Sequence, residues 1–219
     1  MATDRALCRL IDHTLLRPEA LPDEIDRLCD DARAFGFRTV CVQPVFVARA
    51  ARALAGTDVG VAAVVAFPHG ATTTDEKVFE ARQAIDAGAT ELDVVANLGW
   101  IRGGDLAALS AEIGALVAAC GAAPLKVILE TALFDDARKE AAARAVAAAG
   151  AAFVKTSTGF GPGGATVADV ALLRRAVGAA VGVKASGGVK TRAFAQALVA
   201  AGANRLGASA SIALVTTGD

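Results

Sequence analysis

Hydrophobic and polar positions alternate along the chain in two kinds of segment. Short runs rich in valine and isoleucine are separated by longer alanine-rich stretches whose charged residues recur at helical spacing. The short runs predict eight strands, at residues 12–16, 39–43, 60–66, 91–96, 125–130, 152–156, 181–185 and 204–208. This strand–helix order is typical of a (β/α)8 TIM barrel, with a doubly wound open sheet as the alternative. We expect residues 1–219 to form a single domain.

The stretch between the third and fourth predicted strands shows where a helix begins and ends. Thr73 and Glu76 have the spacing of a capping box, which predicts a helix N-terminus. Val78, Ala81 and Ile85 then share one face, and Gly88 is placed to end the helix. A second helix start is predicted at Thr166, with Asp169 three residues further on.

In four of the predicted units, a helix-ending glycine stands five residues before a residue of the following predicted strand. The pairs are Gly36 with Cys41, Gly88 with Asp93, Gly150 with Lys155, and Gly202 with Gly207. These residues fall on strands two, four, six and eight, and alternate strands of a barrel contribute side chains to one interior layer. We therefore expect Cys41, Asp93 and Lys155 to share a layer in which Gly207 leaves room for another group.

The composition excludes several classes of partner. The formal net charge is −1 and aromatic residues make up 5% of the chain, which argues against a nucleic-acid-binding surface. No apolar run approaches the roughly 18 residues that cross a bilayer. Residues 1–20 mix charges with short apolar steps, unlike a signal peptide. We expect a cytoplasmic protein whose partner is a small molecule.

Cysteine and histidine give little support to a metal or redox site. The cysteines are scattered without a C-x-x-C pair, which favours free thiols in a reducing compartment: Cys8, Cys29, Cys41 and Cys120. The two histidines, His13 and His69, lack the spacing of zinc ligands. We expect neither a metal nor a cofactor, and we interpret Cys41 as a small apolar lining residue.

Polar residues gather where the predicted strands end. A single lysine in this position usually points to water, and its pKa of about 10.4 leaves the amine protonated and unreactive. A second ammonium group and desolvation both lower that pKa. Lys155 and Lys184, on neighbouring strands, meet this requirement, and Asp93 is placed to transfer protons. For Asp12 and Glu130, a structural salt bridge is as good an interpretation as a functional role.

Small residues at the last three strands indicate a phosphate site. Gly187 and Gly188 follow strand seven, and Gly207 and Ser209 stand at the end of strand eight. Barrels often bind phosphate through the backbone N–H groups of these two loops. Gly159 adds permissive backbone after strand six. The sequence therefore predicts a phosphorylated small molecule as ligand.

Seven motifs match one known family, in order and across nearly the whole chain. They read "DHTLLRPEA", "ELDVVANLG", "KVILETALF", "FVKTSTGF", "GGATVADV", "VKASGGV" and "RLGASAS". These motifs resemble those of the deoxyribose-phosphate aldolases. The resemblance implies a class I aldolase that reversibly cleaves 2-deoxy-D-ribose 5-phosphate to acetaldehyde and D-glyceraldehyde 3-phosphate, without metal or cofactor.

The resemblance also implies roles for individual residues. Lys155 would form the Schiff base, Lys184 would lower its pKa, and Asp93 would transfer protons together with a water molecule. The phosphate contacts of the family fall on the small residues at the strand ends, Gly159, Gly187, Gly188, Gly207 and Ser209. A homodimer or homotetramer is expected from the family.

Three departures from the family pattern bear on activity. Gln43 stands where an asparagine is common, and Phe160 stands where some members carry a lysine, which removes one charge that would attract phosphate. The chain has no tyrosine, whereas some members use a carboxyl-terminal tyrosine in proton transfer. We expect a weaker preference for phosphorylated substrate and a greater dependence on water and Asp93.

Two other functions remain open at this point. Another Schiff-base barrel lyase would act on a different sugar phosphate or aldehyde, and a panel of substrates would distinguish it. A non-catalytic phosphosugar-binding barrel would bind ligand without forming an imine. The presence of both lysines weighs against the second of these alternatives.

Overall fold

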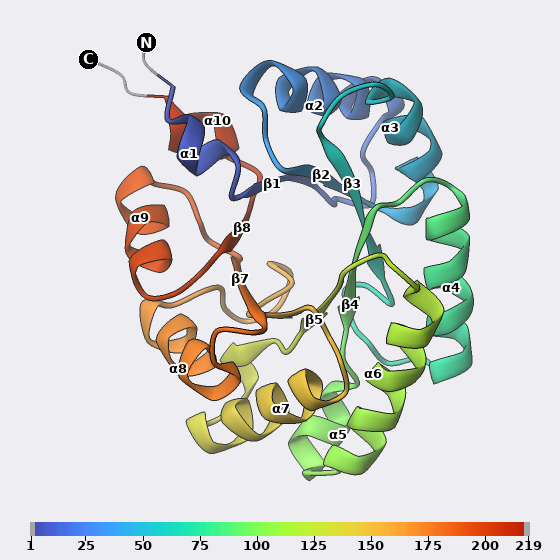
Figure 1. The fold of residues 1–219 in the computed structure, drawn as a ribbon, viewed down its shortest axis with the longest axis vertical. Helices are drawn as coiled ribbons and strands as arrows, with labels where there is room; N and C mark the ends of the chain where they lie inside the picture. The colour runs from blue at the N-terminus through green and yellow to red at the C-terminus, as the bar shows by residue number, and fades with distance from the viewer. Residues whose placement is uncertain (1–2, 217–219) are drawn as a thin grey trace.

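Eight parallel strands close into a barrel in the computed structural model, which describes residues 3–216 (Figure 1). The strands are β1 (Ile11–Leu15), β2 (Thr39–Val42), β3 (Gly60–Val65), β4 (Glu91–Val95), β5 (Leu125–Ile128), β6 (Phe153–Lys155), β7 (Gly182–Ser186) and β8 (Arg205–Ala208). Each strand pairs with the next, and β8 pairs with β1 in a register that sets Gly207 beside Asp12. The predicted (β/α)8 barrel is confirmed, and the open sheet is wrong.

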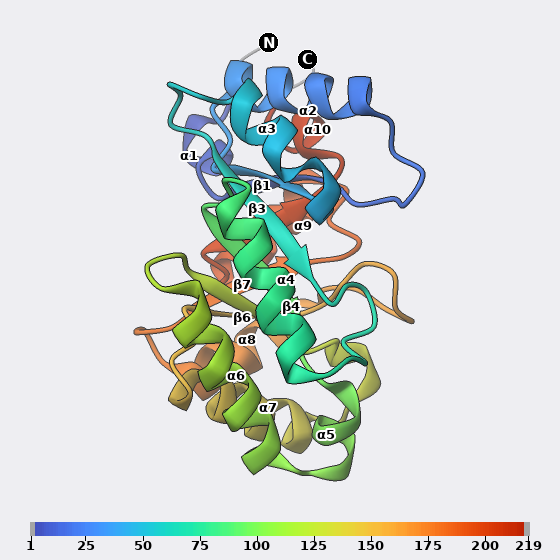
Figure 2. The same ribbon diagram turned by 90° about the vertical axis from the view of Figure 1, so that its right-hand side faces the viewer.

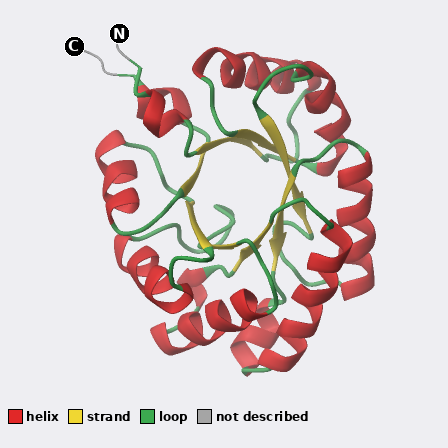
Figure 3. Ribbon diagram, viewed as in Figure 1, coloured by secondary structure: helices red, strands yellow, loops and turns green. Residues whose placement is uncertain are grey.

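Helices surround the barrel on its outside (Figure 3). The longer ones are α2 (Pro22–Phe35), α3 (Val47–Ala53), α4 (Thr74–Asp86), α6 (Leu106–Cys120), α7 (Asp136–Ala148), α8 (Val167–Val177) and α9 (Arg192–Ala200). The shorter ones are α1 (Arg5–Cys8), η1 (Pro44–Phe46), α5 (Leu98–Gly103), η2 (Thr131–Leu133) and α10 (Ser211–Val215). Figure 2 shows α4 and α6 running along the outside of the barrel near β4. Within residues 3–216, no helix combines the length and apolar character needed to cross a membrane.

The observed strands match the predicted ranges to within one residue at each end, except at β5. The predicted strand over residues 125–130 ends at Ile128. Glu130 has a φ of 53°, in the left-handed region that side chains rarely adopt, so the chain leaves the extended conformation there and enters the short helix η2. Glu130 therefore lies beyond the strand that was expected to carry it.

The predicted helix boundaries are also present. The Thr73 hydroxyl accepts from the Glu76 N–H, and the Glu76 carboxylate accepts from the Thr73 N–H, which completes the capping box of α4. The Thr166 hydroxyl caps α8 by accepting from the Asp169 N–H at 3.0 Å. The glycines that precede strands β2, β4, β6 and β8 all have left-handed φ values: Gly36 at 67°, Gly88 at 106°, Gly150 at 95° and Gly202 at 113°.

The core has two parts, because successive side chains of a strand point to opposite faces. On β2, Val40 and Val42 belong to the large apolar cluster that joins the outer face of the barrel to the helices. Cys41, between them, belongs to a small cluster with Leu16, Ala62 and Val64, against which Phe67 packs. This small cluster lines the part of the interior formed by β2, β3 and the residue that follows β1.

Candidate active site

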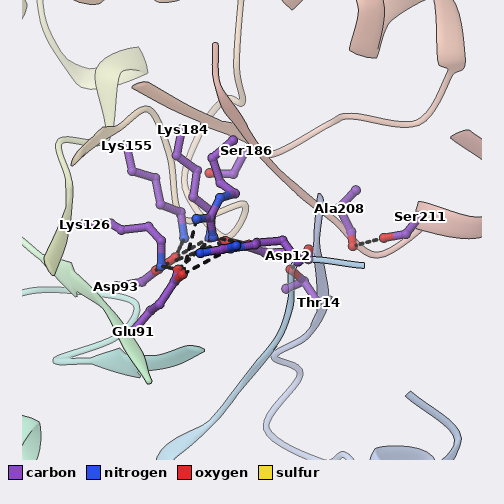
Figure 4. Close-up of polar contacts among 12 residues, drawn as sticks. Asp12, Thr14, Glu91, Asp93, Lys126, Lys155, Lys184, Ser186, Ala208 and Ser211 are labelled. Carbon is purple, nitrogen blue, oxygen red and sulfur yellow. Dashed lines mark hydrogen bonds and ion pairs between the residues drawn. The ribbon is translucent and has the colours of Figure 1, made fainter. Parts of the chain in front are cut away.

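Seven charged side chains form a connected network inside the barrel. They come from six strands and each is at most 6% exposed: Asp12, Glu91, Asp93, Lys126, Lys155, Lys184 and Arg205. Figure 4 shows the three lysines directed toward Asp93, with Glu91 and Asp12 completing the group. The interior of the barrel is therefore apolar along β2 and β3 and charged along the remaining strands.

Asp93 on β4 is the centre of this network. Its Oδ2 accepts hydrogen bonds from Lys155 Nζ at 2.6 Å and from Lys184 Nζ at 2.7 Å. Its Oδ1 accepts from Lys126 Nζ at 2.8 Å. The register of β6 and β7 sets Lys155 beside Lys184, so the two lysines reach the same carboxylate oxygen from neighbouring strands. The structure thus brings together the three residues that the sequence singled out.

Deeper in the barrel, a second set of contacts supports the first. Arg205 donates to Asp12 Oδ1 at 2.7 Å and to Glu91 at 2.7 and 3.2 Å. Lys126 Nζ lies 2.7 Å from Glu91 Oε2, and Lys184 also forms an ion pair with Asp12. Asp12, for which a functional role and a structural salt bridge were equal alternatives, therefore holds Lys184 from the side opposite Asp93.

Sequence reasoning missed Lys126, Glu91 and Arg205. One signal was available for Lys126, because it stands five residues after Gly121, the spacing that identified Asp93 and Lys155. Glu91 and Arg205 precede Asp93 and Gly207 by two residues, so they face the same side of their strands.

The pKa values of the network differ in direction. Burial lowers the pKa of Lys155, and the neighbouring Lys184 lowers it further, while Asp93 offsets only part of the shift. Burial acts in the same direction on Lys184, but Asp12 and Asp93 outweigh it and raise the pKa of this lysine. Burial alone would raise the pKa of Asp93, yet Lys126, Lys155 and Lys184 together hold it well below its usual value.

Lys155 differs from the other two lysines of the network, because its pKa is lowered while those of Lys126 and Lys184 are raised. With every group ionised, four cations would face three anions. A neutral Lys155 leaves three of each, so the interior is balanced when this one amine is deprotonated and able to act as a nucleophile. The sequence analysis named a second ammonium group and desolvation as causes of the lowered pKa of Lys155, and burial is the larger of the two.

Gly207 and Cys41 occupy the remaining two positions of the predicted layer. A Cβ atom on Gly207 would lie 3.2 Å from Lys184 Cε and 3.0 Å from Ser186 Cβ, so the missing side chain leaves room for Lys184. Cys41 is fully buried in the small apolar cluster, and burial raises the pKa of its thiol. Cys41 is therefore a lining residue held as the neutral thiol.

A cavity of about 480 Å³ opens beside Lys155. It is lined by all five of the residues predicted to contact phosphate, namely Gly159, Gly187, Gly188, Gly207 and Ser209. Arg17 and Lys190 also line this cavity, although the sequence analysis did not select them, and the Arg17 guanidinium forms ion pairs with Glu19 and Glu24. Arg17 and Lys190 each follow the end of a strand, β1 or β7, by a few residues, which is the signal that could have found them.

Phe160 is the aromatic residue of the cavity lining and is 52% exposed. Its ring meets the ring of Phe67 edge to face, with 5.3 Å between centroids. Phe67 in turn packs against the small apolar cluster of the interior. The wall of the cavity on this side is therefore apolar, where the sequence already indicated the absence of a positive charge.

Glu130 does not join the charge network. Its carboxylate lies beneath the loop that follows β6, where Oε2 accepts from the N–H and the hydroxyl of Thr158.

Among residues 3–216, histidine, cysteine and carboxylate side chains do not gather in a group of three or more that could hold a metal ion.

The chain is similar to known aldolases over nearly its whole length. The family model described as DeoC/LacD family aldolase matches residues 8–217. The chain is 54% identical over 213 residues to a deoxyribose-phosphate aldolase of Rhodospirillum rubrum, covering 97% of this chain and 90% of that protein. It is 50% identical over 208 residues to one of Brevibacillus brevis, covering 95% and 94%.

Solved structures agree with the sequence comparison. A protein of Coccidioides immitis has a TM-score of 0.92 at 42% identity, covering 95% of this chain and 83% of that one. The deoxyribose phosphate aldolase of Aeropyrum pernix, whose structure is described as tetrameric, has a TM-score of 0.90 at 33% identity, covering 96% and 89%. The likeness therefore extends over almost the whole barrel.

Proposed function

This chain belongs to the DeoC/LacD family of aldolases, and from that premise we propose that it reversibly cleaves 2-deoxy-D-ribose 5-phosphate to acetaldehyde and D-glyceraldehyde 3-phosphate. One observation carries the proposal. The buried amine of Lys155, whose pKa is lowered, lies beside a cavity lined by glycine-rich loops and donates to Asp93. A lowered pKa increases the fraction of neutral amine, and we assign the adjacent cavity to the phosphorylated aldehyde.

In the cleavage direction, the neutral Lys155 amine attacks C1 of the open-chain sugar, and loss of water gives a protonated imine. A base removes the proton of the C3 hydroxyl, the C2–C3 bond breaks, and its electron pair forms an enamine while D-glyceraldehyde 3-phosphate leaves. Protonation of the enamine at C2 gives the imine of acetaldehyde, and water then releases acetaldehyde and the free amine. Atoms and charge balance without an external redox partner.

Lys184 and Asp93 have different tasks in this scheme. Asp93 enters each step as the carboxylate, because its pKa is held well below its usual value, and we assign it proton acceptance together with water. Lys184 stays protonated, since Asp12 and Asp93 raise its pKa, and its charge favours the neutral form of Lys155. Both assignments rest on the shared oxygen Oδ2 of Asp93.

The phosphate of the substrate is assigned to the opposite part of the cavity. Backbone N–H groups of Gly159, Gly187, Gly188 and Gly207 and the side chain of Ser209 are the proposed contacts, and Lys190 adds a positive charge. Phe160 presents an aromatic ring where some relatives would present an ammonium group, so we infer a weaker preference for phosphorylated over unphosphorylated substrate.

Reductive trapping tests the proposal. We expect borohydride reduction in the presence of acetaldehyde to give one adduct, located by peptide mapping on Lys155 among the six lysines of the chain. Lys77, which is also buried and also has a lowered pKa, is the internal control and should remain unmodified. Lys155→Ala should lose the adduct and lower kcat/KM on the order of 10³-fold or more.

Two results would overturn the assignment. A folded protein that binds 2-deoxy-D-ribose 5-phosphate but gives no adduct would be a phosphosugar-binding barrel. A trapped adduct on Lys155 with no cleavage of this sugar, but with cleavage of another in a substrate panel, would identify a different Schiff-base lyase.

The compartment and the assembly stay predictions. The cytoplasm follows from the sequence features described above, and a homodimer or homotetramer follows from the family. The Aeropyrum pernix structure is described as a tetramer, which supports an oligomer as the assembly to test first.

A further inference from the structure

Glu130 is a buried carboxylate that the proposed chemistry does not use. It is 2% exposed, and its backbone adopts the left-handed conformation with a φ of 53°, a costly choice for a residue with a side chain. Its Oε1 has no hydrogen-bond partner among the described residues. A buried carboxylate is normally hydrogen-bonded, and in Glu130 the interaction is made by the other oxygen, Oε2.

That interaction is with Thr158, three residues after Lys155. The Thr158 hydroxyl donates to Glu130 Oε2 at 2.5 Å, and the Thr158 N–H donates to the same oxygen at 3.2 Å. Because its proton is committed to Glu130, this hydroxyl presents a lone pair to the Phe160 N–H, which donates to it at 3.0 Å. One carboxylate oxygen therefore fixes residues 158–160, which all line the cavity.

The remainder of the loop is packed closely against the same carboxylate. A Cβ atom on Gly161 would lie 2.7 Å from Glu130 Cδ, so the chain passes the carboxylate at a distance that a larger residue could keep only if the carboxylate moved. On the other side, the Ala165 N–H donates to the carbonyls of Ser186 and Gly187, which belong to β7 and to the loop that follows it. The loop over residues 157–164 is thus held between Glu130 and the loop that follows β7.

We propose that Glu130 is a positioning residue for substrate phosphate. Through Thr158 it holds the loop so that Gly159 faces Gly187, and it thereby sets the spacing of backbone donors on the two sides of the cavity. Recognition by backbone N–H groups depends on their placement to within about 0.5 Å. Lys155 is held by Asp93 instead, so Glu130 governs substrate affinity and leaves imine formation unaffected.

The inference rests on the proposed aldolase function, and the test separates the two. Glu130→Ala should raise the KM for 2-deoxy-D-ribose 5-phosphate about tenfold or more. The rate at which acetaldehyde and borohydride modify Lys155 involves no phosphate, and it should change less than about threefold. If the wild-type chain forms no adduct, the proposed function fails; if the adduct forms and Glu130→Ala leaves KM unchanged, only the present inference fails.

The Glu130→Gln variant tests whether the loop needs a hydrogen-bond acceptor or a negative charge at this position. In Glu130→Gln, the amide oxygen can take the place of Oε2, and its NH2 group takes the place of Oε1, which has no partner to lose. We expect the KM of this variant to stay within about threefold of wild type. An increase as large as that of Glu130→Ala would show that the negative charge is required and would overturn the positioning role.

Thr158→Val provides a second route if Glu130→Ala does not fold. It removes the hydroxyl that Glu130 orients and should raise KM to a similar degree. The loss in the double variant should be clearly smaller than the sum of the two single losses, because both changes break the bond between the Thr158 hydroxyl and Glu130 Oε2. Glu140→Ala is the matched control, since this glutamate is exposed on α7 and pairs with Arg144 on the same helix. Equal losses of imine formation and substrate affinity would indicate general loss of structure and contradict the proposal.

Discussion

Two buried lysines, Lys77 and Lys155, can be compared as a structural ion pair and as the amine to which we assign reactivity. Lys77 is 0% exposed and Lys155 is 2% exposed, and burial lowers the pKa of both amines. Each donates to a buried carboxylate, Lys77 to Glu112 at 2.9 Å and Lys155 to Asp93 at 2.6 Å. A lowered pKa and a short ion pair are therefore not sufficient to identify a nucleophile.

The two sites differ in how their charges are paired and in what lies beside them. Lys77 and Glu112 form a pair of one cation and one anion between α4 and α6, outside the barrel. The same groups bind the chain after Asp93, because Lys77 donates to the Val95 carbonyl and Glu112 accepts from the Asn97 N–H. Lys155 instead shares its carboxylate with two other lysines and lines a cavity. The surplus of cations and the cavity are the two features that distinguish Lys155, the proposed nucleophile, from Lys77.

Breaking the ion pair between Lys77 and Glu112 should give the largest effect on stability. Glu112→Ala leaves Lys77 buried without its counter-ion, and we expect the free energy of unfolding to fall by about 3–5 kcal/mol. Urea denaturation at pH 7 measures this loss. The pH dependence of kcat/KM should keep its wild-type shape, because the network inside the barrel is untouched. A shift in the low-pH side of the kcat/KM profile would contradict the structural role assigned to Lys77 and Glu112.

Lys184→Met changes the surplus of cations inside the barrel. Because a neighbouring cation lowers the pKa of an amine, removing Lys184 raises the pKa of Lys155, and less of the neutral amine exists at any given pH. We expect kcat/KM at neutral pH to fall roughly 10²-fold and the acid limb of its pH profile to move to higher pH. A limb that stays in place or moves to lower pH would contradict the assignment.

Glu112→Gln should produce the smallest change. The amide oxygen keeps the hydrogen bonds from Lys77 and Asn97, so we expect a loss of stability on the order of 2 kcal/mol at pH 7. Without the opposing charge, the pKa of Lys77 in the folded state falls further below its unfolded value. The unfolded chain then binds more protons, so the deficit relative to wild type should narrow as the pH rises. Denaturation curves at pH 7 and 9 would test this, and a constant deficit would contradict it.

The sequence was sufficient for the architecture and for the three residues at the centre of the charge network. Strand ends followed by glycine-rich loops are local features, so Lys155 and Lys184 could be found from their own neighbourhoods. The five-residue spacing after Gly88 and Gly150 placed Asp93 in the same layer as Lys155 because it measures the distance from a helix end into the following strand.

Contacts across the barrel could not be predicted in this way. Arg205 and Glu91 meet although they are 114 residues apart, and their pairing arises only when β8 closes the barrel opposite β4. Glu130 was misplaced for a different reason. Its position in the sequence suggests a strand end, but its left-handed backbone takes it out of the strand and beneath the next loop.

With Lys155 neutral, the interior of the barrel holds as many cations as anions. In the proposed reaction, the protonated imine returns a full positive charge to the nitrogen of Lys155, and the surplus reappears among groups that cannot move away from it. Transfer of the C2–C3 bonding electrons to that nitrogen removes the surplus again. The protein matrix therefore makes the intermediate a strong electron sink, so the balance that frees the amine to attack also pulls electrons out of the bond to be broken.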